Sequence, residues 1–246
     1  MKKSILTILF LAVISNSFAH YIWIETNPSG KINNEHEIKI RFGEFSEGVI
    51  EKVSGENFNN VKEFTIWLIA PDGSKTSLQA IAKNDYYSTS FIPQQKGTYT
   101  IALDNKNIKV FDYTKYDYTT FKPEYHAKAR VVVESLISEL KSTNPEGIEI
   151  IDVTPKSHQN TQEVTLKVLY KNTALKNGEI TLFTAEKWSL KEKTNDQGLV
   201  TFKLPKKTIY TVEVTHEEKV PGTYKEVDYK LIWHCATYFI NNTRFE

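Results

Sequence analysis

The chain has 246 residues, a formal net charge of +1 and a single cysteine, Cys235. A near-neutral balance excludes the basic face of a nucleic-acid-binding protein, so we expect no nucleic-acid partner. One cysteine excludes an intramolecular disulfide, so the fold depends on its core, for which the chain is long enough.

The first 19 residues have the pattern of a secretory signal peptide. Two lysines precede an apolar run, Ile5–Ile14, and Ser-Phe-Ala at residues 17–19 offers small residues at the −3 and −1 positions of a cleavage site. The run is shorter than the about 20 residues that span a bilayer, and no later segment approaches that length. We therefore predict a mature chain that begins at His20, is periplasmic or secreted, and has no transmembrane segment.

Most of the remaining chain alternates apolar and polar residues with a period of two, which predicts strands. The segments with this pattern are Glu37–Phe42, Phe64–Leu68, Tyr99–Leu103, Val164–Leu169, Glu179–Phe183 and Tyr210–Val214. Turn sequences separate them at the spacing of β-sandwiches. A weak internal repeat, Phe91 to Tyr99 and Phe202 to Tyr210, predicts a hairpin with aromatic core residues in each half.

One segment departs from this alternation. Pro123–Leu140 has apolar residues three and four apart, which predicts a short amphipathic helix, although three valines at 131–133 leave a strand open. A linker-like sequence, Asn144–Gly147, follows it. We predict an all-β fold of two sandwich modules, of the immunoglobulin or transthyretin type, with one short helix between them. The predicted divisions are a signal peptide at residues 1–19, an N-terminal sandwich with the helical segment at 20–145, and a C-terminal sandwich at 146–246.

Histidines are the candidate metal ligands. A mature N-terminus at His20 combines a free α-amine with an imidazole, a pair that can chelate Cu²⁺ or Ni²⁺ in a square-planar or tetragonal site. His234 is its best partner because it is a polar residue in the apolar strand predicted at Leu231–Ile240, although a hydrogen-bonded structural role fits it equally. His216, at the end of another predicted strand, is a weaker candidate. Strand parity directs Cys235 to the opposite face, where it packs as a small hydrophobe.

Short motifs follow one another along nearly the whole mature chain: Ala19–Ile24, Arg41–Gly43, Phe91–Leu103, Tyr125–Ala129, Thr194–Phe202 and His234–Thr237. In this order they resemble a family of exported bacterial proteins of unknown function, related to the periplasmic component of nickel and cobalt uptake systems. The hairpin at Thr194–Phe202 also resembles carboxypeptidase-regulatory-like and transthyretin-like modules, a resemblance that concerns the fold alone.

The family resemblance implies all-β modules and a role in handling transition metals outside the cytoplasm. Related uptake components use the mature N-terminus and a nearby His as ligands, which carries over to His20. Where many relatives have Gly-His, this chain has Gly43-Glu44, so a carboxylate replaces a nitrogen ligand. The related components also contain membrane spans, so the resemblance implies a separate membrane metal-uptake complex as the partner of this chain.

The function predicted from these residues is metal binding without catalysis. Hydrolase elbows, phosphate loops, dinucleotide fingerprints and the His-Glu-x-x-His pattern are absent from the sequence. We predict that His20 and His234, with Glu44 or His216 completing the site, bind a divalent nickel, cobalt or copper ion for delivery to an uptake system. The alternative is a non-catalytic envelope scaffold, adhesion or carbohydrate-contact sandwich without metal.

Overall fold

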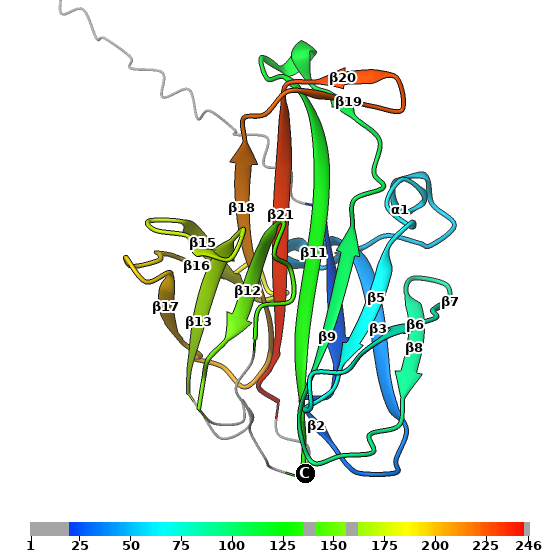
Figure 1. The fold of residues 1–246 in the computed structure, drawn as a ribbon, viewed down its shortest axis with the longest axis vertical. Helices are drawn as coiled ribbons and strands as arrows, with labels where there is room; N and C mark the ends of the chain where they lie inside the picture. The colour runs from blue at the N-terminus through cyan, green and yellow to red at the C-terminus, as the bar shows by residue number, and fades with distance from the viewer. Residues whose placement is uncertain (1–19, 135–140, 156–161, 244–246) are drawn as a thin grey trace, which may run out of the picture.

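The computed structural model describes residues 20–134, 141–155 and 162–243, and its regular secondary structure is almost entirely strand (Figure 1). The predicted signal peptide lies outside these ranges. The described residues contain one α-helix of a single turn, α1 (Glu56–Asn59). They also contain two 3-10 helices, η1 (Phe45–Glu47) and η2 (Thr114–Tyr116). No helix of the described residues is long and apolar enough to cross a bilayer.

A 10-stranded sheet, here called the central sheet, extends through the molecule. Its strand order is β16 (Ser189–Lys193), β15 (Glu179–Phe183), β18 (Ile209–Glu218), β21 (Leu231–Asn241), β11 (Thr120–Val133), β9 (Gly97–Asn105), β5 (Thr65–Ile69) and β6 (Lys75–Leu78). Two short strands, β10 (Phe111–Asp112) and β2 (Ser29–Gly30), pair with β11.

Two smaller sheets and a hairpin complete the fold. The N-terminal sheet has the order β1 (Tyr21–Thr26), β3 (His36–Glu44), β8 (Tyr87–Phe91) and β7 (Ile81–Ala82), with β4 (Val49–Ile50) paired to β3. The C-terminal sheet has the order β12 (Ile148–Asp152), β13 (Glu163–Tyr170) and β14 (Thr173–Ala174), with β17 (Leu199–Lys203) paired to β13. The hairpin is β19 (Gly222–Tyr224) with β20 (Val227–Tyr229).

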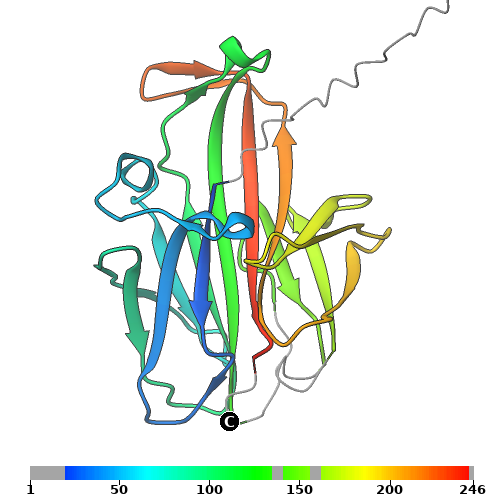
Figure 2. The ribbon, with the colours of Figure 1, turned by 180° about the vertical axis from the view of Figure 1, so that it is seen from behind.

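The long strands β11 and β21 run parallel at the centre and are covered on both faces. β12 of the C-terminal sheet lies in front of them in Figure 1, and β1 of the N-terminal sheet lies in front of them in the reverse view of Figure 2. Odd-numbered residues such as Tyr125, Trp233 and Cys235 therefore enter a first core beneath the N-terminal sheet, whereas Ala236 and Tyr238 enter a second core. This confirms the predicted face assignment of the closing strand and the core position of Cys235.

The internal repeat corresponds to two equivalent corners. The Tyr99 hydroxyl accepts the backbone N–H groups of Gln94 and Gln95 at 3.2 and 3.0 Å. The Tyr210 hydroxyl accepts the N–H of Lys206 at 2.9 Å and donates to its carbonyl at 2.8 Å. A tyrosine that bonds to the backbone a few residues upstream is a feature of immunoglobulin-like sandwiches. All four aromatic residues of the repeat are buried, which confirms their predicted core positions. The predicted hairpins are wrong, because β8 and β17 belong to the two smaller sheets whereas β9 and β18, which follow them, belong to the central sheet.

The helix predicted at Pro123–Leu140 is wrong as far as Val133, because those residues belong to β11; residues 135–140 lie outside the described ranges. The strand has an apolar face and a charged face, and both are buried, so the charged residues between the apolar ones resembled the polar side of a helix. β-branched valines favour the extended form. The short helix of the structure, α1, lies in the N-terminal half and not between the two halves.

Candidate metal centre

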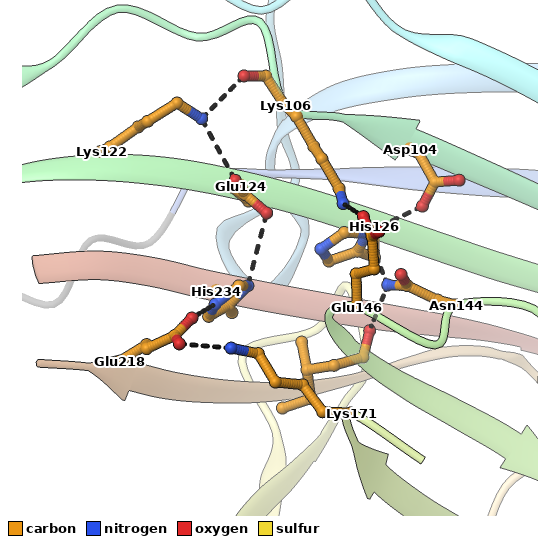
Figure 3. A network of polar contacts seen from close by, with 11 residues as sticks. Asp104, Lys106, Lys122, Glu124, His126, Asn144, Glu146, Lys171, Glu218 and His234 are labelled. Atoms are coloured by element: carbon orange, nitrogen blue, oxygen red, sulfur yellow. Dashed lines mark hydrogen bonds and ion pairs between the residues drawn. The ribbon is translucent and has the colours of Figure 1, made fainter. Parts of the chain in front are cut away.

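Two neighbouring strands of the central sheet bring three ligand-type side chains together. The parallel register of β11 and β21 places Glu124 beside His234. His126 lies two residues beyond Glu124 and projects from the same face. All three residues are buried, with relative exposures of 8% for Glu124, 3% for His126 and 1% for His234. Figure 3 shows these side chains and the polar groups around them.

The geometry of the three side chains suits a metal ion. One ligand atom from each lies within 4.8 Å of the other two, so this buried group can bind a metal. The two imidazole rings are stacked at 21° with their centroids 6.1 Å apart. Bonds of about 2.0–2.2 Å to one ion bring ligand atoms to about 3–3.5 Å from one another. Coordination therefore requires the three ligand atoms to move closer together.

Two nitrogen atoms of the group are buried without a hydrogen-bond partner in the described part of the chain: Nε2 of His126 and Nδ1 of His234. Leaving a buried polar atom unsatisfied costs about 1–3 kcal/mol. Space beside one of them is preserved by Gly147, where a Cβ atom would lie 3.0 Å from His126 Nε2. A bound cation would satisfy both nitrogens at once.

His234 is uncharged at neutral pH, as a histidine must be to bind a metal. Burial lowers the pKa of His234 to about 4, although Glu124 and Glu218 oppose this shift. The imidazole is therefore neutral at pH 7 and has one nitrogen lone pair available. Its Nδ1 lies 3.7 Å from Oε2 of Glu124, beyond hydrogen-bond distance, and its Nε2 lies 3.2 Å from Oε2 of Glu218.

Farther along β11, the same face contains buried ion pairs. Lys128 of β11 pairs with Glu149 of β12. Arg130 of β11 pairs with Asp152 of β12, with Nε 3.0 Å from Oδ2. Each cation there is matched by a carboxylate, as buried charges require.

Glu124 is held differently, because only one of its oxygens is engaged by a cation. Nζ of Lys122 lies 3.2 Å from Oε1 of Glu124 and donates to the backbone carbonyl of Lys106 at 2.7 Å. The other oxygen, Oε2, faces His234 (Figure 3). Glu124 thus presents one carboxylate oxygen to the point where the two histidines have free nitrogens.

The structure places two of the predicted site residues together. His216 of β18 is directly opposite His234 of β21 in the antiparallel register. It is half-buried, and the Tyr170 ring lies against both histidines, with centroids 4.2 Å from His216 and 5.5 Å from His234. His216 therefore lies beside the buried group, on its more exposed side.

The other two predicted residues, His20 and Glu44, lie on the opposite side of the central sheet. The His20 carbonyl accepts a hydrogen bond from the Tyr125 hydroxyl at 3.2 Å, and Tyr125 belongs to the first core. His20 Nε2 lies 3.0 Å from Oε1 of Glu51. Glu44 follows Gly43, the strand partner of Tyr21, so it is near His20. The sheet separates both residues from His234.

Sequence reasoning missed Glu124 and His126. In a helix, residues two apart point in different directions, so the predicted helix concealed their common face. The available signal was the acid-x-histidine spacing on a stretch whose odd positions are apolar from Phe121 to Val133. Such a spacing places both side chains on one face of a strand.

Comparison with known proteins defines the family but not the chemistry. No curated protein matches the chain. Among solved structures, the CARDB domain of a Pyrococcus furiosus protein, in complex with di-metal ions, matches at 12% identity with a TM-score of 0.26, covering 49% of this chain and 94% of that chain. Similarity at that level carries no argument about this site. A family model described as a domain of unknown function, DUF4198, matches residues 17–218. Because this match extends over most of the chain, the protein belongs to the DUF4198 family.

Proposed function

We propose that this protein is a non-enzymatic, exported binding protein for a divalent transition-metal ion, which is held by Glu124, His126 and His234. The observation that carries the proposal is the pair of buried imidazole nitrogens without partners, beside a carboxylate oxygen that is also free of cations. A structural polar cluster normally satisfies such atoms with one another. These three instead converge on one point without bonding to each other.

The donor set indicates the class of metal. Two imidazoles and one carboxylate suit borderline divalent ions, and imidazole is a good ligand for nickel, copper, zinc and iron. The soft thiolate that favours Cu(I) is excluded, because Cys235 lies on the opposite face of β21, in the first core. Nickel and cobalt, the ions that the family resemblance implies, and Cu²⁺, which imidazole ligands also bind, remain the proposed cargo.

Export and delivery rest on the sequence. The signal-peptide pattern supports a periplasmic or secreted protein, and the resemblance to nickel and cobalt uptake components supports transfer to a membrane uptake complex. His20, with Glu44 nearby, is proposed as a separate chelating terminus that forms after cleavage. The paired tyrosine corners support the assignment of both halves as immunoglobulin-like sandwiches.

Calorimetric titration with Ni²⁺, Co²⁺, Cu²⁺ and Zn²⁺ tests the proposal on protein processed to begin at His20. Wild-type protein should bind one ion at the buried site. His126→Ala and His234→Ala should each lower the affinity for the metal by more than about 100-fold. Loss of a residue that only contacts a ligand typically lowers it by about 10–100-fold, and these variants remove a ligand itself. His20→Ala is the matched comparison, because it should remove only the ion chelated at the N-terminus and leave unchanged the affinity of the buried site on the other side of the sheet.

Three outcomes contradict the proposed site. Wild-type protein that binds none of these ions favours the scaffold alternative. Unchanged affinity in His126→Ala and His234→Ala also contradicts it, provided that their circular dichroism spectra match that of wild type. Loss of all binding in His20→Ala alone would place the site at the N-terminus instead.

A further inference from the structure

We infer that Asp104 and Glu218 are positioning residues that fix opposite tautomers in the two histidines, so that each presents its unprotonated nitrogen to the metal position. The inference rests on the proposed function and adds two residues outside the ligand set. Neither carboxylate belongs to the group of three ligand atoms, and each contacts one histidine through the nitrogen that faces away from the group (Figure 3).

His126 is fixed by Asp104. Oδ1 of Asp104 lies 2.9 Å from His126 Nδ1, and a carboxylate can only accept, so Nδ1 must carry the hydrogen. With the hydrogen of Nδ1 directed at Asp104, the Asn144 amide cannot donate to the same nitrogen, although its Nδ2 lies 3.0 Å away, and it donates instead to the Ile148 carbonyl at 3.1 Å. Nε2 is left with the lone pair, and it is the buried nitrogen without a partner.

His234 is fixed in the opposite sense by Glu218. Oε2 of Glu218 lies 3.2 Å from Nε2 of His234, which therefore carries the hydrogen. Lys171 pairs with the other oxygen of Glu218, and a carboxylate can only accept a hydrogen bond. The lone pair then lies on Nδ1, the buried nitrogen that faces Glu124.

Glu124, the third ligand, is also held through one atom and free at another. Lys122 engages Oε1 of Glu124 and leaves Oε2 toward His234. Each ligand is thus anchored through one atom and free at another, and the free atoms are those that face one another. Outer-shell carboxylates that accept the second N–H of a ligating histidine set its tautomer and raise its basicity. These contacts set the tautomers and the anchored atom of each ligand before metal arrives.

The test reads the tautomers directly in metal-free protein. In ¹⁵N-labelled protein, long-range ¹H–¹⁵N correlation spectra at neutral pH should show hydrogen on Nδ1 of His126 and on Nε2 of His234. Asp104→Leu and Glu218→Leu remove the acceptor, so each should disturb its own histidine's tautomer and lower Ni²⁺ affinity by about 10–100-fold.

Matched amide variants separate positioning from simple charge attraction. Asp104→Asn and Glu218→Gln lose the negative charge but retain an oxygen that accepts the same N–H. Positioning predicts that both amide variants keep the wild-type tautomers and much higher Ni²⁺ affinity than the Leu variants. Equal loss of affinity in the amide and Leu variants would show that charge alone matters, and would overturn the inference.

The inference and the proposed function fail in different ways. Hydrogen on Nδ1 of His234 or on Nε2 of His126 in the metal-free spectra overturns the positioning role, even if the protein binds Ni²⁺. Wild-type protein that shows the expected tautomers but binds no Ni²⁺, Co²⁺, Cu²⁺ or Zn²⁺ overturns the metal function, and with it the role of Asp104 and Glu218 in metal binding.

Discussion

Two carboxylates of β18 titrate in opposite directions because their surroundings differ. Glu218 is paired with Lys171 and His234, and its pKa is lowered to about 2 despite burial. Burial raises the pKa of Glu213 to about 7, against weaker opposing effects from Cys235 and Lys191. The carboxylate with a cation beside it stays ionised, whereas the one beside a thiol retains its proton to higher pH.

The raised pKa of Glu213 predicts a pH-dependent stability. The folded protein holds this proton more tightly than the unfolded chain, whose glutamate pKa is 4.5. Stabilisation from the protonated carboxyl is fully present below about pH 4.5 and is lost as pH rises through about 7. Urea unfolding between pH 4.5 and 8 measures this, and Glu213→Gln should remove up to about 3 kcal/mol of the pH-dependent change. Identical pH profiles for wild type and variant would contradict the shift.

At the scale of elements, each of the six segments in which apolar and polar residues alternate corresponds to an observed strand. The segments at Glu37–Phe42, Tyr99–Leu103 and Tyr210–Val214 all lie within observed strands. β11 was missed because its second face is charged and is nevertheless buried, against β12. Sequence patterns treat charged residues as exposed, so they cannot reveal a face whose charges are matched by another strand.

The candidate site was predictable only in part for the same reason. His234 stood out as a polar residue within an apolar strand, and the structure places it in the group. Glu124 and His126 lay in the segment predicted as a helix, and their proximity to His234 depends on the parallel pairing of β11 with β21. These strands are separated by about 100 residues, so their pairing cannot be derived from local patterns.

The face assignment of β21 gives a prediction for Trp233. Its ring packs against Tyr125 at a centroid distance of 6.0 Å, and the residue is 7% exposed. Trp233→Ala should therefore lower the free energy of unfolding by about 3–5 kcal/mol. Tyr116→Ala is the control, since Tyr116 is 55% exposed and should change stability by less than about 0.5 kcal/mol. Equal effects in the two variants would mean that Trp233 does not support the core.

At the scale of the whole molecule, the central sheet joins the two halves. It takes β5, β6, β9 and β11 from before the predicted boundary at 145–146, and β15, β16, β18 and β21 from after it. The division into two separately folding domains remains a prediction. The candidate metal group lies where the halves meet, because Glu124 and His126 come from the first half and His234 from the second.

This position predicts how metal affects stability. An ion bound only to the folded state raises the melting temperature, and here it links strands from both halves. Calorimetry with saturating Ni²⁺ should show one unfolding transition at a higher temperature than in chelator-treated protein. The same increase in His126→Ala would contradict binding at this group, and separate transitions of which only one responds would contradict a shared site.

The proposed metal site between the two halves holds one ion, bound by Glu124, His126 and His234. Anomalous diffraction at the nickel absorption edge, from crystals of correctly processed protein grown with Ni²⁺, tests it most directly. We expect an anomalous peak about 2.0–2.2 Å from a Glu124 oxygen, His126 Nε2 and His234 Nδ1. A peak at the His20 terminus with none between β11 and β21 would contradict it.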